Sequence, residues 1–430
     1  MWNFDGVACA AALELGQPSY FFHANHLLYG FFGFLFWKGI GTPLGIVRAL
    51  PALQLFTSLL SATGLVGLYR LMDSILHHKV IALGVTLSLA VTAAFWVWSV
   101  EAQVYALGFL ALAWATFVLT STSGPQKYVW TGLLHGAAVL GHQMHLLWIV
   151  PALYWIRQES DFQPRDVKRY LGSLTGVVLI PYALVVAFVI APRRDLTHIL
   201  IWLKGSAGLN RDRHWAWHFP GWTGPWIWFK STAPMLWGSF WPYGKTTVTT
   251  GLWIMTAVAA VVALILFWRA VKEIHERWVV FALLWLGVYG LFLSTWEPST
   301  LCYRIVDVIP LGILMAIALR SLKITTQATL IILFLTTTLT VNLITRIGPM
   351  RHEEQNTLYQ ETLTLSRITS PNSLYITEGG MSWMYLLYFT GRTAWYRNSW
   401  EPQRLEAEIA RQKKIRTVYL QKGSAWEPVR

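Results

Sequence analysis

The sequence is poor in charged residues and in cysteine. Only 13% of its 430 residues are Asp, Glu, Lys or Arg, whereas a typical soluble protein has about 25%. So little charge cannot cover the surface of a globular protein of this length. The two cysteines, Cys9 and Cys302, are too few for a disulfide framework or a cysteine-based zinc motif. The sequence contains no internal repeat and no nucleic-acid-binding motif, so we expect no nucleic-acid partner.

Apolar residues dominate the chain instead. Hydrophobic residues make up 55% of it and 25 residues are Trp, a residue that is enriched where a membrane meets water. Several segments approach or reach the ~20 apolar residues that are needed to span a bilayer. The pattern therefore predicts a multi-pass integral membrane protein of the plasma or inner membrane, in contact with the lipid bilayer.

Residues 1–346 contain all of the predicted spans, which makes this part an all-α polytopic membrane domain of about nine to ten transmembrane helices. Residues 1–48 contain no convincing span, because the apolar run 29–40 is short and includes Lys38. This run is more typical of helices that lie at the membrane interface. The expected spans and shorter apolar helices are 50–69, 80–98, 103–121, 128–141, 143–156, 171–191, 247–268, 279–295, 304–320 and 325–346.

Residues 347–430 have a different pattern, with more charge and shorter apolar runs. Alternating apolar residues predict strands, and longer polar stretches between them predict helices. The expected strands are 373–377, 393–397 and 415–420, and the expected helices are 381–390 and 401–413. The C-terminal part is thus predicted to be a small soluble α/β domain.

The basic residues predict the orientation in the membrane, because Lys and Arg in short loops favour the cytoplasm. If residues 1–48 are outside, the short inner loops contain twelve basic residues and the short outer segments contain three. This orientation places Asp5, the turn 99–101, the Trp-rich segment 192–246, the loop 296–304 and the C-terminal domain together on the extracytoplasmic side. An outer N-terminus also leads us to expect a further transmembrane helix upstream of Met1.

Two acidic residues are the candidates for catalysis. Asp5 lies beside Gly6, so its carboxylate could approach a substrate closely and act as a base; the alternative is an ordinary solvated carboxylate near the chain terminus. Glu101 lies in the apolar stretch FWVWSVEAQVYAL, where a carboxylate at membrane depth is costly and usually functional. The alternative for Glu101 is an acid that favours the positive end of a helix dipole. Tyr105 follows four residues later, on the same helical face.

Several other polar residues are candidates for substrate binding. His26 and Tyr29 follow Asp5 in the N-terminal stretch, and Trp296 precedes Arg304 at the outer start of a span. Arginine suits a phosphate group because its planar fork binds two oxygens, although a lone Arg at a span end more often snorkels to the lipid headgroups; the pair 193–194 is a weaker candidate for the same role. The outer Trp run (Trp215, Trp217, Trp222, Trp226, Trp228) suits either the membrane surface or stacking on sugar rings.

Three histidines lie close together in LLHGAAVLGHQMHLL. His135, His142 and His145 come within about 80° of one another on a helix of 3.6 residues per turn. Metal ligation is conceivable for such a set. No acidic residue lies near them, however, so a polar cavity lining or hydrogen-bonded packing is the better interpretation.

Three stretches resemble the GT-C superfamily of integral-membrane glycosyltransferases, and most closely its protein O-mannosyltransferase-like branch. The stretch from Asp5-Gly6 to NHLLYG resembles the first outer loop of that branch, FWVWSVEAQVYAL its second outer turn, and LHGAAVLGHQMHLL its later Gly-His segment. The resemblance covers residues 5–156 well and 157–346 by topology. QPSYFFHANH replaces the usual His-Pro-Pro-Gly-type turn.

The resemblance implies an inverting hexosyl or mannosyl transfer from a sugar linked to polyprenyl or dolichyl phosphate to an extracytoplasmic hydroxyl on a protein, glycan or lipid. It implies that Asp5 is the base, that Glu101 is a second acidic site residue and that an outer Arg, for which we choose Arg304, binds the lipid phosphate. His26, Tyr29, Tyr105, His142 and Trp296 complete the expected substrate-binding set. No cofactor is required by this chemistry, and a divalent cation is left open. The alternatives are a transporter or flippase of lipid-linked sugars and a non-catalytic membrane scaffold.

Overall fold

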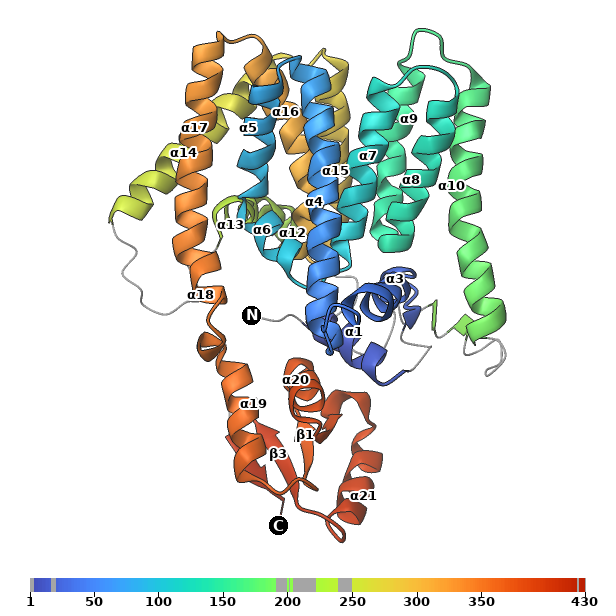
Figure 1. Cartoon of the computed structure of the whole chain (residues 1–430), viewed down its shortest axis with the longest axis vertical. Helices are drawn as coiled ribbons and strands as arrows, with labels where there is room; N and C mark the ends of the chain where they lie inside the picture. The colour runs from blue at the N-terminus through green and yellow to red at the C-terminus, as the bar shows by residue number, and fades with distance from the viewer. Residues whose placement is uncertain are drawn as a thin grey trace.

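The computed structural model describes residues 4–16, 21–190, 199–200, 202–203, 222–238, 250–423 and 425–429. An upright helix bundle stands above a small α/β domain, and the helices α1 (Phe4–Glu14) and α3 (Tyr29–Phe36) lie between them (Figure 1). Six described helices are long and apolar enough to cross a membrane, or seven if one bent pair counts as a span. The chain is therefore a multi-pass integral membrane protein with a small C-terminal sheet, which confirms the predicted fold class.

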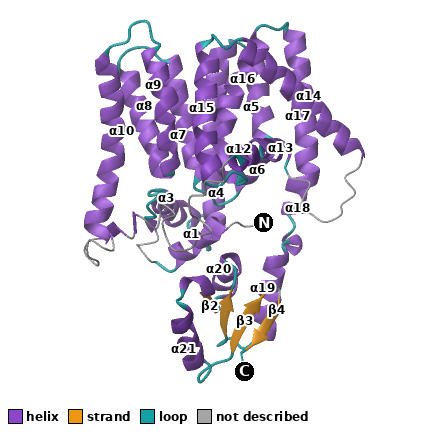
Figure 2. Ribbon diagram, turned by 180° about the vertical axis from the view of Figure 1, so that it is seen from behind, coloured by secondary structure: helices purple, strands orange, loops and turns teal. Residues whose placement is uncertain are grey.

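The bundle helices follow the predicted spans, with shifted ends. They are α4 (Ala49–Leu76), α5 (Lys79–Ala90), α6 (Ala93–Val100), α7 (Tyr105–Ser121), α8 (Gln126–Gly141), α9 (Ile149–Arg157), α10 (Pro164–Val185), α14 (Thr250–Lys272), α15 (Arg277–Thr295), α16 (Val308–Arg320) and α17 (Ile324–Asn342). Helices α4, α7, α8 and α10 pack in succession on one side of the bundle, and α5, α14, α16 and α17 pack together on the other. The shorter α7, α8 and α9 stand beside the long helices (Figure 2).

The predicted span 80–98 is broken into two helices, because the chain bends by 74° between α5 and α6. The bend lies at Val91 and Thr92, and the Thr92 hydroxyl donates a 2.7 Å hydrogen bond to the carbonyl of Leu89. Such a bond offers the backbone an alternative to continuing the helix. As a result α6 crosses the lower part of the bundle and carries Glu101, at its C-terminal end, toward α1.

Short elements connect the bundle helices at its lower end. They are η1 (Trp37–Gly41), η2 (Gln143–Trp148), η3 (Val186–Ile190), α12 (Thr223–Lys230), α13 (Thr232–Trp237), η6 (Leu301–Asp307), η7 (Leu343–Ile347), α18 (Gly348–Met350) and η8 (Glu353–Gln355). The predicted candidates Arg193, Arg194, Trp215 and Trp217 lie outside the described residues.

The C-terminal domain is a four-stranded sheet with helices packed against it. Its elements are α19 (Thr357–Ile368), β1 (Leu374–Thr377), α20 (Gly380–Thr390), β2 (Thr393–Tyr396), η9 (Arg397–Ser399), α21 (Pro402–Gln412), β3 (Val418–Lys422) and β4 (Ala425–Pro428). The strand order is β2-β1-β3-β4, with β1 parallel to both neighbours and β4 antiparallel to β3. Parallel strands need crossover connections, which α20 and α21 provide. Helix α20 contacts α1, so this domain docks on the N-terminal segment.

The predicted inner loops share one end of the bundle. The α4–α5, α7–α8, α9–α10, α14–α15 and α16–α17 connections lie opposite α1 and the C-terminal domain (Figure 1). The basic residues counted in these loops are thus separated by the bundle from Asp5 and from the sheet.

Candidate active site

Asp5 lies in the first turn of α1, where a carboxylate is favoured by the helix dipole. The next residue, Gly6, packs directly on the segment after α6. A Cβ atom at position 6 would lie 2.5 Å from the carbonyl oxygen of Ala102, which is closer than any side chain tolerates. The absence of a side chain at Gly6 therefore lets α1 approach this segment. This contact brings together two segments about a hundred residues apart, one that carries Asp5 and one that carries Glu101.

The carboxylate of Asp5 is half-buried and accepts no hydrogen bond from the described residues. Burial raises its pKa from 3.8 to about 6, because the charged form loses solvation. Its charge acts on Tyr105, Cys302 and Tyr303 across the site. A carboxylate with a pKa near neutrality and no competing partner has the properties of a general base.

An aromatic wall lies beside Asp5. The ring of Tyr105 is centred 5.1 Å from His142 and 5.1 Å from Tyr303, and Tyr303 also contacts His142 at 6.0 Å. The indole nitrogen of Trp296 donates a 3.5 Å hydrogen bond to the hydroxyl of Tyr303. Tyr303 thus contacts three of the predicted substrate-binding residues, Tyr105, His142 and Trp296. Tyr303 itself was not among the predicted site residues.

His26 lies near His142, close enough that a charge on one imidazole would disfavour a charge on the other. Its ring stacks on His23 with centroids 4.3 Å apart. The Gln143 side chain and backbone hold this loop by bonds of 2.8 Å to the carbonyl of Ala24 and 2.9 Å to that of Asn25. Burial lowers the pKa of His26 well below its usual value, so this imidazole is neutral at physiological pH.

Glu101 is 5% exposed and caps the C-terminal end of α6. It lines a cleft of about 290 Å³ with Gln54, opposite Arg351, His352 and Glu353 from the start of the C-terminal region. Carboxylate, guanidinium and imidazole groups thus face one cleft, where they can hold a polar substrate group.

Tyr29 supports the turn that follows Glu101 through Thr57. It is 1% exposed, and its hydroxyl shares a 2.9 Å hydrogen bond with Thr57. The Thr57 oxygen also accepts the backbone N–H of Gln103 at 3.3 Å. The structure places Tyr29 inside this support and not on an open surface.

Arg304 is 2% exposed and is surrounded by protein groups. Its Nε donates a 2.7 Å hydrogen bond to the Asp307 carboxylate, and its Nη1 donates to the Trp228 carbonyl at 2.9 Å and the Ser231 hydroxyl at 2.6 Å. Nη2 reaches the Thr232 hydroxyl at 3.3 Å. These bonds tie η6 to α12 and α13. A lipid phosphate could reach the guanidinium only if some of these contacts opened.

The remaining histidines of the Gly-His segment are packed in the bundle. His135 bonds the hydroxyl of Tyr170 at 2.6 Å and the carbonyl of His145 at 2.7 Å, and His145 bonds the hydroxyl of Tyr289 at 3.1 Å. Hydrogen-bonded packing is thus the correct interpretation of His135 and His145. Among the residues that the structure describes, no group of three or more His, Cys, Asp or Glu side chains could hold a metal ion.

The arrangement is similar to two solved structures of ArnT from Cupriavidus metallidurans, one bound to undecaprenyl phosphate and one in the apo state. Both have a TM-score of 0.59 and cover 97% of this chain, at 11% and 12% identity, and the match covers 87% and 88% of the ArnT chains. ArnT is a GT-C glycosyltransferase. The chain has the GT-C fold. No protein-family model and no curated protein sequence matches it.

Within this GT-C fold, sequence reasoning missed two residues of the site region. Tyr303 joins the aromatic wall, and its position beside Arg304 in an otherwise apolar span was a usable signal. Asp307 is fully buried against Arg304. Its spacing of three residues from Arg304, which places both on one helical face, could have revealed the pair.

Proposed function

We propose that this chain transfers a sugar from a polyprenyl-phosphate donor to an acceptor hydroxyl, with inversion at the anomeric carbon. The observation that carries this proposal is the half-buried carboxylate of Asp5, which has a pKa near 6, accepts no hydrogen bond from the described residues and lies on the helix that packs against the segment after Glu101. The GT-C fold supports it, because the ArnT structure of the same fold was solved with undecaprenyl phosphate bound.

In the proposed reaction Asp5 removes the proton from the acceptor hydroxyl as its oxygen attacks the anomeric carbon. The new C–O bond forms as the bond between that carbon and the phosphate oxygen breaks, and polyprenyl phosphate leaves with the electron pair. Because the phosphate is a good leaving group, the reaction needs mainly one base and groups that hold the phosphate charge. The proton remains on Asp5 until solvent takes it.

The other predicted residues take supporting roles in this proposal. Glu101 positions the acceptor at the cleft that it lines, and Tyr105, His142, Trp296 and His26 form the wall against which the sugar packs. Tyr29 acts through Thr57 on the Glu101 turn. Arg304 as the phosphate-binding group stays a prediction, which requires that its contacts to Ser231 and Thr232 exchange for phosphate oxygens.

The active site and the C-terminal domain are proposed to face the extracytoplasmic side. The support is the charge of the opposite end of the bundle, where the short loops collect twelve basic residues. The same proposal includes three finer alternatives. The sugar is mannose, the chain is related to the protein O-mannosyltransferase-like branch, and the acceptor is a protein in place of a glycan or lipid.

Mass spectrometry of the products tests the proposal directly. The full chain in nanodiscs is given synthetic polyprenyl-phosphate mannose, glucose or arabinose and a hydroxyl acceptor. We expect an inverted glycoside and free polyprenyl phosphate, and loss of about three orders of magnitude in rate for Asp5→Asn, as for removal of a general base. Asp161→Asn, an exposed carboxylate at the opposite end, is the matched control. Movement of intact donor across the bilayer without turnover would indicate a flippase, and no reaction of either kind a scaffold.

A further inference from the structure

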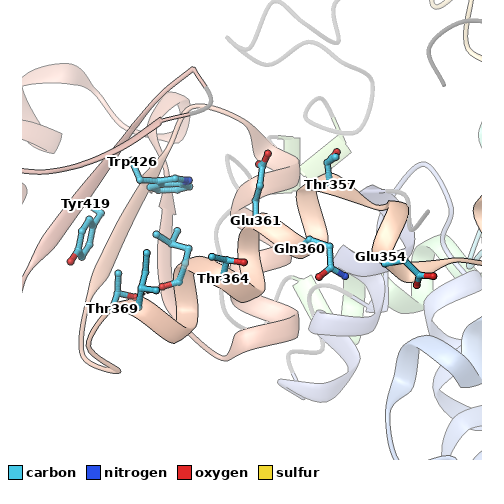
Figure 3. Close-up of a pocket in the computed structure, with 10 residues that line it drawn as sticks. Glu354, Thr357, Gln360, Glu361, Thr364, Thr369, Tyr419 and Trp426 are labelled. Atoms are coloured by element: carbon cyan, nitrogen blue, oxygen red, sulfur yellow. The ribbon is translucent and has the colours of Figure 1, made fainter. Parts of the chain in front are cut away.

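The C-terminal domain contains a pocket of about 530 Å³ between α19 and the sheet. Figure 3 shows Trp426 and Tyr419 on the strands and Thr364, Glu361 and Thr357 along the helix. A hollow of this size is within the range of small-molecule and glycan sites, about 300–1,000 Å³. The proposed transfer does not use this pocket.

Some polar groups of the pocket have partners and others do not: Glu354 pairs with His352, and Gln360 bonds to the carbonyl of Glu353. Thr357, Glu361 and Thr364 are exposed, and their side chains form no hydrogen bond or ion pair with the described part of the chain. They are spaced by four and three residues, so they share one face of α19. The indole N–H of Trp426 is likewise without an acceptor there. Two hydroxyls, a carboxylate and an indole donor therefore converge on the same hollow.

The Trp426 ring is held in place by its neighbours. It packs edge to face on Tyr375, with centroids 5.7 Å apart and planes at 86°, and Tyr375 stacks on Tyr419 at 5.6 Å. An aromatic ring fixed beside hydrogen-bonding groups suits a sugar, whose C–H face packs on the ring while its hydroxyls bond to polar groups.

The charge of the pocket restricts the kind of sugar. Glu354 and Glu361 line it, and the described lining residues include no Lys or Arg. Glu354 already pairs with His352, so a uronic or sialic acid would place its carboxylate beside Glu361 without a Lys or Arg in the described lining, which is unfavourable. Neutral sugars and amino sugars carry no such penalty.

The pocket is also adjacent to the cleft at Glu101. Glu353 and Asn356 line the cleft, and Glu354 and Thr357, the residues that follow them, line the pocket. Helix α19 has 12 residues and is therefore about 18 Å long at 1.5 Å per residue. A chain of sugar units lying along α19 would have one end at Trp426 and the other at the Glu101 cleft.

We propose that this pocket binds neutral or amino-sugar units of a glycan acceptor and directs the end of that glycan to the Glu101 cleft. The role as acceptor site rests on the proposed glycosyl transfer, whereas binding of the sugar itself does not.

Binding of defined trisaccharides to the full chain in nanodiscs tests the inference. The probes are mannotriose, chitosan trimer and trigalacturonic acid, measured by calorimetry. We expect binding of at least one of the first two and none of trigalacturonic acid. Trp426→Ala should weaken this binding about tenfold or more, which corresponds to about 1.4 kcal/mol, and Trp426→Tyr should retain most of it. Glu361→Gln should admit trigalacturonic acid or weaken the amino sugar.

Matched controls are Trp130→Ala, an exposed Trp at the opposite end of the bundle, and Glu406→Gln, an exposed acid on α21; both should bind as wild type. Failure of every trimer to bind, or equal binding to wild type and Trp426→Ala, overturns the inference. Binding of tetralysine that depends on Glu361, with no sugar bound, would identify a peptide site instead.

The same variants separate this inference from the proposed reaction. Asp5→Asn should lose turnover and keep trisaccharide binding. If binding depends on Trp426 but no donor sugar is ever consumed, the proposed transfer is wrong and the sugar site stands.

Discussion

The hydroxyl of Tyr388 donates a 3.0 Å hydrogen bond to the carboxylate of Glu14, across a sequence separation of 374 residues. The same carboxylate accepts the Nε–H of Arg48 at 3.0 Å and the backbone N–H of Ala49 at 2.8 Å. Tyr388 lies on α20, and Glu14 is the last residue of α1. The C-terminal domain is thus hydrogen-bonded to the helix whose first turn carries Asp5.

Tyr388→Phe should loosen α1 and lower the transfer rate without removing any group from the site. The change removes the bond to the charged Glu14, worth about 1.5–3 kcal/mol, and the 3.1 Å bond that the Tyr388 hydroxyl accepts from the backbone N–H of Leu50. We expect a lower kcat with little change in donor KM. Steady-state kinetics and thermal unfolding in nanodiscs measure the two effects. Tyr396→Phe, which loses an exposed bond to Asn398 in the same domain, should behave as wild type. Unchanged kcat in Tyr388→Phe would show that the domain does not position Asp5.

The rate of transfer should depend on the ionisation of Asp5. Burial raises the pKa of this carboxyl to about 6, and only the ionised form accepts a proton. We therefore expect kcat/KM to rise with pH through a midpoint near 6 and to reach a plateau above it. His26, whose pKa is lowered by burial, should not contribute a second step in this range. A flat profile across the midpoint would exclude Asp5 as the base.

The same raised pKa predicts that Asp5 costs stability when it is ionised. A buried acid whose folded pKa lies above its unfolded value destabilises the protein above that folded pKa, and the cost disappears below the unfolded value. Asp5→Asn should therefore unfold at a higher temperature than wild type at neutral pH, and the difference should shrink as the pH falls from about 7 to about 4. Thermal unfolding at several pH values measures it. A difference that grows on acidification would contradict the burial argument.

Gly6→Ala should displace α1 from the turn that carries Glu101. The added Cβ would lie 2.5 Å from the Ala102 carbonyl oxygen, and overpacking of this kind costs about 1–3 kcal/mol. Because the base moves with α1, we expect the rate to fall by about two orders of magnitude, as for small misplacements of reacting groups. Gly39→Ala, whose Cβ would meet nothing within 4 Å among the described residues, is the control and should remain active.

Asp307→Asn should destabilise the bundle strongly, because it leaves the buried Arg304 guanidinium without its counter-ion. Removing one member of a buried ion pair costs about 3–5 kcal/mol. Replacement of both residues, Arg304→Met with Asp307→Leu, should recover much of that stability.

Arg304→Lys provides the kinetic test of Arg304. A higher KM for the donor at unchanged stability supports phosphate binding by Arg304, and lost stability with unchanged KM supports a structural role.

Local pattern was sufficient for three strands and two helices of the C-terminal domain and for most bundle helices, whereas helix α19 (Thr357–Ile368) was not predicted. Strands β1, β2 and β3 and helices α20 and α21 lie within a few residues of the predicted ranges. Strand β4 was missed because AWEP includes Pro and carries no clear alternation. The bend at Val91 and Thr92 was missed because hydropathy does not register a hydroxyl that bonds to the backbone of its own helix.

The sequence by itself determined that the chain is a membrane protein, since apolar length and basic loops depend only on residue order and on the bilayer as solvent. It also selected Asp5 and Glu101. Only the tertiary structure decided that Gly6 packs on Ala102, that Tyr303 joins Tyr105 and His142, and that Arg304 is enclosed with Asp307. Those contacts join segments far apart in sequence, and their energies depend on burial and close approach, which no local pattern encodes.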